Sequence, residues 1–77
     1  MFVEVDARGL YCPIPILRLA CALEPCAPGA RARLLATDPD ALADVEAFCR
    51  ETGATLISRR QEKEIFVFDV KKRGNPI

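Results

Sequence analysis

The chain has 77 residues, enough for one small domain and too few for two. Its Lys and Arg residues equal its Asp and Glu residues at 11 each, so it lacks the positive charge typical of nonspecific nucleic-acid or membrane binding. It contains no histidine, which excludes the commonest general base, Ser-His and Cys-His catalytic pairs and most zinc sites.

The first half of the sequence predicts a strand, a helix and a second strand. Residues 2–6 alternate between apolar and acidic side chains, as in a half-buried strand. A short connection that bends at Gly9 leads to a helix over Pro13–Glu24, which is ended by the prolines and glycine that follow. Residues 30–37 alternate small or apolar side chains with arginines, and they predict the second strand.

The second half begins with a predicted helix. Asp38 can cap its start, and Pro39 suits its first position, where a missing N–H costs nothing. Gly53 is a natural residue to end it. The predicted apolar face of this helix carries Leu42, Val45, Phe48, Cys49 and Thr52.

Two more strands are predicted over residues 54–60 and 64–72, joined by a turn at residues 61–63. We expect a single domain over residues 1–72 and a frayed tail over residues 73–77.

The order β-α-β-α-β-β predicts an α/β chain, more narrowly an α+β two-layer sandwich with a mixed four-stranded sheet and both helices on one face. Right-handed crossovers make the first three strands parallel, and the short last turn makes the fourth antiparallel to the third. Both helices then begin at the carboxyl edge of the sheet, so their positive ends point toward the same region.

We expect a cytoplasmic protein with reduced cysteines. Glu4 and Asp6 appear near the start, and no apolar segment of a signal peptide follows them. The longest uncharged run, residues 9–17, is far shorter than the roughly 20 residues that span a bilayer. The four cysteines are therefore expected to be free thiols.

One motif carries candidate chemistry, Cys12-Pro13-Ile14-Pro15, at the start of the first helix. Cys12 is predicted at the N-cap, Pro13 at the first helical position and Pro15 at the third, where prolines remove amide donors without cost. The Ile14 N–H is then free to point at the sulfur. This donor and the helix dipole should lower the thiol pKa below its usual value of about 8.5.

Two further points affect the interpretation of Cys12. Arg8 and Arg18 lie near it in sequence and could add positive potential. The alternative is the usual state of a free cysteine, a small buried hydrophobic side chain. The flanking prolines favour a reactive thiol, because they fix the turn and leave the cysteine exposed at a helix end.

The chain resembles the TusA-like (SirA-like) family of sulfur carriers over roughly residues 3–72. The resemblance rests on the stretch 6–15 with its Cys-Pro-x-Pro motif, on Pro-Gly at 28–29, on Asp-Pro at 38–39 and on Phe-Cys at 48–49. It implies a sheet ordered 1-2-4-3 and a motif cysteine that accepts a sulfane sulfur as a persulfide and hands it to another protein.

Carried over by position, the resemblance makes Cys12 the persulfide carrier, with Pro13 and Pro15 as its frame. We also expect Gly9 and Asp38 to shape the site. It implies no cofactor besides the persulfide, a sulfur donor of the cysteine desulfurase or rhodanese type, and an acceptor protein. Family members serve tRNA thiolation, sulfane-sulfur trafficking, or molybdenum-cofactor or selenium metabolism. We expect no membrane partner and no direct binding of nucleic acid.

Persulfide transfer suits the residues present. A thiolate attacks a sulfane sulfur and exchange to another thiolate follows, which requires an accessible cysteine and no general base. Two alternatives belong to other classes. One is a non-catalytic regulatory module of the same fold that binds protein or RNA, and the other is a thiol-disulfide redox protein, which needs a resolving cysteine near Cys12.

The other cysteines have structural interpretations. Cys49, on the apolar face of the second helix, is expected in the core, with a resolving cysteine as the alternative. Cys21 follows Cys12 on one helix at roughly 13 Å, too far for a disulfide. Cys26 is farther still, although Cys21 and Cys26 could approach each other. The chain lacks a Cys-x-x-Cys pair, so we expect no zinc site.

The outer face of the first helix is the predicted docking surface for a partner. Ile14, Leu17 and Arg18 lie there with Cys21, and apolar residues within one turn of Cys12 favour protein contact. The alternative for Leu17 is partial burial against a loop. The inner face is expected to pack on the sheet through Ile16, Leu19, Ala20 and Leu23.

Three smaller features have two interpretations each. Residues 59–60 and 71–73 are solvated charge runs or a docking patch for an acidic partner or RNA. Alternation over residues 65–70 predicts that the open face of the sheet is a partly apolar association surface. Asp38 is a simple helix cap or, at the same sheet edge as Cys12, a residue that tunes that site.

Overall fold

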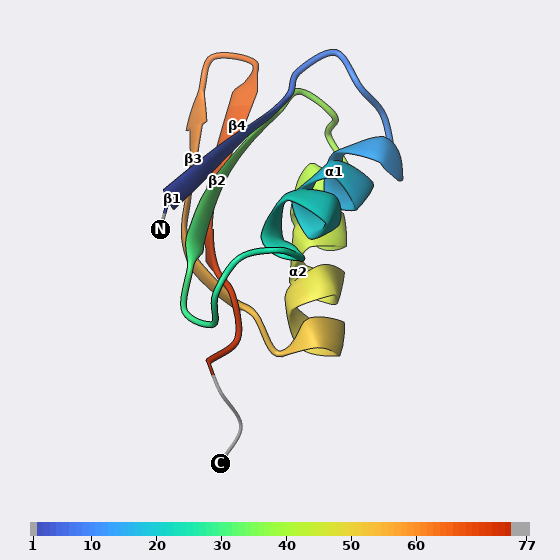
Figure 1. Ribbon diagram of the computed structural model, residues 1–77. Coiled ribbons are helices and arrows are strands. Elements are labelled where there is room, and N and C mark those ends of the chain that lie inside the picture. The colour runs from blue at the N-terminus through green and yellow to red at the C-terminus, as the bar shows by residue number, and fades with distance from the viewer. Residues whose placement is uncertain (1, 75–77) are drawn as a thin grey trace.

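The computed structural model describes residues 2–74, in which two helices cover one face of a four-stranded sheet (Figure 1). The elements are β1 (Phe2–Ala7), α1 (Ile14–Leu23), β2 (Arg31–Ala36), α2 (Ala41–Thr52), β3 (Thr55–Glu62) and β4 (Ile65–Lys71). The sheet order is β1-β2-β4-β3, with β1 parallel to β2 and β4 antiparallel to both β2 and β3. The predicted α+β sandwich and its strand order are confirmed. Neither helix in this described part is long and apolar enough to cross a membrane.

One apolar layer between sheet and helices forms the core. Alternate residues of β1, β2 and β4 are buried on the side that faces the helices, as the period of two in a strand requires. They pack against α1 and against Ala41 and Val45 of α2. The residues predicted on the inner face of α1 are all buried or half-buried: Ile16, Leu19, Ala20 and Leu23.

The start of α2 differs from the prediction, because Asp38 does not cap this helix and Pro39 is not its first residue. The helix begins at Ala41 with Asp40 at its N-cap. The Asp38 carboxylate instead accepts hydrogen bonds from the backbone N–H groups of Cys12 (2.7 Å) and Asp40 (3.0 Å). Asp38 and Pro39 therefore belong to a loop that precedes the helix and is tied to the segment before α1.

The hairpin between β3 and β4 turns later than predicted. β3 continues through Glu62, which pairs with Ile65, so the turn consists of Lys63 and Glu64 rather than residues 61–63. Lys63 takes a left-handed backbone conformation with φ of 60° to close this tight connection.

Gly53 ends α2 as predicted, with φ of 81° and its N–H bonded to the Cys49 carbonyl at 2.9 Å. Arg73, assigned to the tail by the sequence, covers this glycine, since a Cβ at Gly53 would lie 2.8 Å from the Arg73 Cδ. The last residues of the predicted tail, 75–77, lie outside the described residues.

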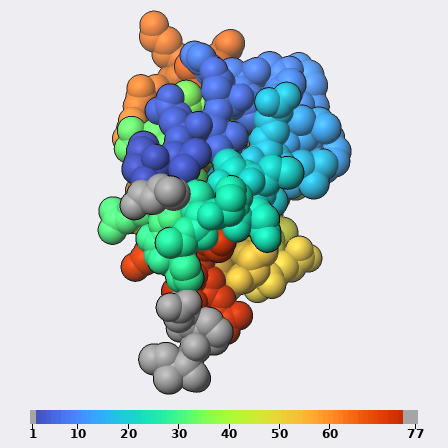
Figure 2. Space-filling model, in the orientation of Figure 1, coloured from blue at the N-terminus to red at the C-terminus, as the bar shows by residue number. Residues whose placement is uncertain are grey.

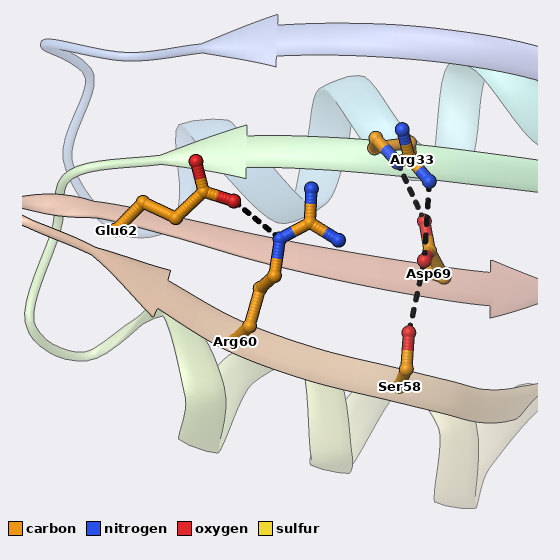
Figure 3. Close-up of polar contacts among 5 residues, drawn as sticks. All are labelled: Arg33, Ser58, Arg60, Glu62 and Asp69. Atoms are coloured by element: carbon orange, nitrogen blue, oxygen red, sulfur yellow. Dashed lines mark hydrogen bonds and ion pairs between the residues drawn. The ribbon is translucent and has the colours of Figure 1, made fainter.

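The open face of the sheet carries a polar network (Figure 3). Arg33 on β2 forms an ion pair with Asp69 on β4 at 2.8 Å, and the Ser58 hydroxyl donates to the same carboxylate at 2.9 Å. The Arg33 hydrogen bond is the first cause that lowers the pKa of Asp69. Arg60, from the predicted charge run 59–60, pairs with Glu62. This face also carries an exposed apolar side chain, since Phe2 is 57 % exposed with Arg33 over its ring at 5.5 Å. The predicted partly apolar surface is therefore present beside the paired charges, and its role in association stays a prediction.

Lys72 closes the carboxyl end of α1 rather than extending into solvent. Its Nζ donates to the carbonyl oxygens of Leu23 (2.9 Å), Glu24 (3.0 Å) and Cys26 (2.7 Å). These carbonyl groups have no partner inside the helix, and a cation is favourable at the negative end of the helix dipole. The interpretation of residues 71–73 as a solvated charge run is therefore wrong for Lys72.

The contacts of Lys72 predict a loss of stability when its charge is removed. Lys72→Met keeps most of the aliphatic stem but leaves three carbonyl groups without their charged donor, so we expect the free energy of unfolding to fall by about 2 kcal/mol. Urea unfolding measures this change. The matched control is Lys71→Met at an exposed position, and equal losses in the two variants would contradict the capping role.

Candidate functional site

Cys12 lies exposed on the turn between β1 and α1. The segment from this turn into α1, light blue in Figure 2, forms a projecting corner of the molecule. The helix begins one residue later than predicted, so Pro13 is the N-cap and Pro15 the second helical residue. Cys12 therefore precedes the N-cap. Pro13 is exposed, whereas Pro15 is buried and anchors the first turn of the helix.

Side chains from the loop before α2 hold the backbone around Cys12. Asp38 accepts the Cys12 N–H, and the Thr37 hydroxyl oxygen accepts the Gly9 N–H at 2.8 Å. Gly9 has φ of 80°, a conformation that favours glycine. The structure thus brings Gly9, Asp38 and Cys12 together. Thr37 was not singled out from the sequence, because a threonine at a strand end carries no local signal for this contact.

The electrostatic surroundings of Cys12 are opposite to those predicted. The pKa of its thiol is raised to about 11, and the first cause is the Asp44 carboxylate, which favours the protonated thiol as a potential acceptor for its hydrogen. Partial desolvation adds to this rise, as do the negative charges of Asp44, Asp38 and Asp40. Although Asp44 favours the protonated thiol, its Oδ2 atom is buried and has no formed hydrogen bond within residues 2–74.

The amide groups at the start of α1 do not offset these acidic residues. Pro13 and Pro15 have no N–H, and the Ile14 N–H donates to the Tyr11 carbonyl at 2.8 Å instead of pointing at the sulfur. The predicted amide donor for the thiolate is therefore already used. A helix N-terminus lowers a thiol pKa through such free donors, so this one has little effect on Cys12.

One of the two arginines expected near the thiol, Arg8, is engaged elsewhere. Arg8 binds the Asp6 carboxylate through its backbone N–H, Nε and Nη2, at 3.1, 2.9 and 2.7 Å. This contact lowers the pKa of Asp6 to about 2. Arg18 lines a hollow between α1 and β1 with Leu17 and Cys21. Neither arginine is among the groups that shift the pKa of Cys12, so the positive potential expected from Arg8 and Arg18 is not borne out.

In the described part of the chain all four cysteines are free thiols. Cys26 is buried and its Sγ donates to the Ala22 carbonyl at 3.2 Å, whereas Cys21 is exposed. Cys49 packs against the core, as expected, and burial raises its pKa. No group of three or more Cys, Asp or Glu residues within residues 2–74 is arranged to hold a metal ion.

Exposed apolar side chains lie close to Cys12 along the chain. Tyr11 is 70 % exposed, Ile14 40 % and Leu17 52 %, so the alternative that Leu17 is buried against a loop is wrong. Leu17 also borders a groove of about 280 Å³ between α1 and α2. The floor of this groove is apolar, and Asp44 and Glu51 line it on the α2 side.

The acidic surroundings of Cys12 predict slow alkylation at neutral pH. Asp44→Asn removes the acceptor and the charge that favour the protonated thiol, so the pKa of Cys12 should fall from about 11 toward 9. At pH 8 the rate of alkylation by iodoacetamide should then rise at least about tenfold, since each pKa unit changes the thiolate fraction by that factor. Peptide mass spectrometry across a pH series measures the midpoint, and equal midpoints in both proteins would rule out the role of Asp44.

The hydrogen bonds of Asp38 predict a second effect. Asp38→Asn leaves one acceptor oxygen for two backbone N–H donors, so one N–H loses its partner. We expect the free energy of unfolding to fall by about 1–3 kcal/mol. Asp40→Asn is the control with the same charge change, since the exposed Asp40 side chain makes no capping hydrogen bond. The loss should be smaller in the control, and urea unfolding that shows no difference would contradict the bridging role.

Comparison with known proteins agrees with the resemblance in the sequence. The family model described as Sulfurtransferase TusA matches residues 3–72. Sulfur carrier protein TusA of Allochromatium vinosum is 41% identical over 69 residues, covering 90% of this chain and 91% of that protein. Sulfur carrier protein TusA of Pseudomonas paraeruginosa is 31% identical over 71 residues, covering 92% and 90%. The crystal structure of a SirA-like protein from Desulfitobacterium hafniense shares the fold, with a TM-score of 0.80 at 19% identity over 92% of this chain and 97% of that one. The chain belongs to the TusA sulfurtransferase family.

Proposed function

We propose that this protein is a sulfur carrier that accepts a sulfane sulfur as a persulfide on Cys12 and passes it to an acceptor protein. The observation that carries the proposal is the exposed Cys12 thiol, held by Asp38 at the projecting start of α1. Membership of the TusA family supports it, because matched relatives are named sulfur carrier proteins. Cys21 is also exposed, but it lacks a comparable anchor from a second loop.

The reaction consists of two exchanges at sulfur. The Cys12 thiolate attacks the outer sulfur of a donor persulfide, so that a new S–S bond forms at Cys12 and the donor leaves as a thiolate. An acceptor thiolate then attacks the outer sulfur on Cys12, and Cys12 leaves as a thiolate. The sulfane sulfur and its proton move in each step, and no external oxidant or reductant is consumed.

Two partners follow from this cycle. The donor would be a protein persulfide, for which cysteine desulfurases and rhodaneses are the expected types, and the acceptor would be a protein thiol in a relay such as tRNA thiolation or cofactor sulfuration. Ile14, Leu17 and Arg18 are the residues we assign to docking, because all three are exposed on the side of α1 that carries Cys21.

Mass spectrometry tests the proposal after incubation with a sulfane-sulfur donor. We expect a gain of about 32 Da on the peptide that contains Cys12, reversed by a reductant. Cys12→Ser should abolish the gain, whereas Cys21→Ser, which removes the other exposed thiol, should leave it unchanged. Sulfur that settles equally on other cysteines in Cys12→Ser would overturn the assignment. Full biological function without Cys12 would favour a non-catalytic binding module.

A further inference from the structure

A groove of about 340 Å³ lies between the start of α2 and the strands of the β3–β4 hairpin. Pro39 and Leu42 line it on the α2 side, and Phe66 and Phe68 line it from β4. The two phenylalanine rings stack with their centroids 6.4 Å apart, yet Phe66 is only half-buried. The helices therefore leave an aromatic floor partly open to solvent at this end of the sheet.

One side of the groove carries an arginine without a carboxylate partner in the described part of the chain. Arg59 on β3 pairs in the sheet with Phe68, which packs in the core beneath the helices. Residues directly opposite each other on antiparallel strands share a face, so Arg59 lies on the helix side of the sheet and borders the groove. The ion pairs within residues 2–74 join Arg8 to Asp6, Arg33 to Asp69 and Arg60 to Glu62. Arg59 takes part in none of them, so its charge is available to an anion.

A second hollow, of about 540 Å³, continues the groove toward the loop that carries Cys12. The two hollows share Pro39, Gln61 and Phe66, and the second also reaches Gly9 and Tyr11. The turn that joins β3 and β4 lies at the same end of the sheet as the loop between β1 and α1 (Figure 1). The result is a long, open groove, which suits an extended peptide better than a small molecule, since small-molecule sites enclose most of the ligand surface.

We propose that this groove docks an acidic segment of a partner protein, with an apolar side chain over Phe66 and a carboxylate paired with Arg59. The apolar floor is removed from water on binding, and a guanidinium pairs with a carboxylate through two parallel hydrogen bonds that also orient it. A single unpaired arginine in a chain of zero net charge suits a carboxylate better than the many phosphates of a nucleic acid. The inference goes beyond the proposed function, because docking here requires no chemistry at Cys12.

Titration with a synthetic peptide tests the groove directly. The probe is a short blocked peptide with one phenylalanine among glutamates, added to isotope-labelled protein while amide shifts are followed by NMR. We expect the largest shifts at Leu42, Gln61 and Phe66, and weaker binding in about 0.5 M salt. Peptides with lysines in place of the glutamates, or with glycine in place of the phenylalanine, should each bind at least about fivefold more weakly. Millimolar acidic peptide that shifts none of these three amides would overturn the proposal.

Charge variants assign the recognition to Arg59. Arg59→Gln changes an exposed side chain, so the free protein should keep its spectrum while the acidic peptide binds at least about fivefold more weakly. Arg50→Gln is the control with the same change in net charge, because Arg50 is exposed in the last turn of α2, away from the groove. It should bind the peptide as the parent does. Equal weakening in both variants would overturn the proposal, since the effect would then be one of net charge.

Two further comparisons separate the groove from the sulfur chemistry and from nucleic-acid binding. Cys12→Ser should bind the peptide unchanged, and Arg59→Gln should still gain sulfur from a small sulfane-sulfur donor. Peptide binding by a parent protein that gains no sulfur would leave the groove intact and refute the proposed function. A short single-stranded RNA that shifts the same amides at lower concentration than the acidic peptide would overturn the choice of a protein segment.

Discussion

The buried carboxylate of Asp38 is the interaction on which the site depends. It is 4 % exposed and receives the N–H groups of Cys12 and Asp40, which belong to the loops before the two helices. A desolvated carboxylate is tolerated only when its oxygens are satisfied, so both loops must be in place together. The position of the sulfur at the start of α1 is consequently set by residues at the start of α2.

The succession of helices and strands along the chain, the strand directions and the packing of the helices on the sheet could be predicted because they depend on local patterns, whereas the strand order within the sheet came from the family resemblance. Alternation identifies the strands, Gly53 ends α2, and the right-handed crossover rule determines the strand directions. The predicted boundaries failed where a distant contact competes with a local one. Asp38 is a residue type that commonly caps helices, but its carboxylate instead accepts a hydrogen bond from a backbone N–H that lies 26 residues earlier in the chain.

The exposure of Cys12 was predicted from its flanking prolines at a helix end, and the exposure of Ile14 and Leu17 was predicted from helical periodicity. The proton affinity of the thiol could not be predicted from the sequence, because it depends on which charges face the sulfur in three dimensions. Asp44 offered one signal, an acidic residue in the first turn of a helix expected to start at the same sheet edge as Cys12. The sequence cannot show how closely two helices pack, and that spacing determines whether this carboxylate faces the thiol.

Lys72 links the end of the first helix to the end of the last strand, across 46 to 49 residues of sequence. While the chain is being synthesised, α1 emerges early, yet its final carbonyl groups must wait for β4 to insert between β2 and β3. The carboxyl end of α1 is therefore capped only when all four strands of the sheet are in place. Partly synthesised or truncated chains would therefore carry a first helix with a loosened carboxyl end, whereas the anchor of Cys12 at the other end requires only the loop that contains Asp38.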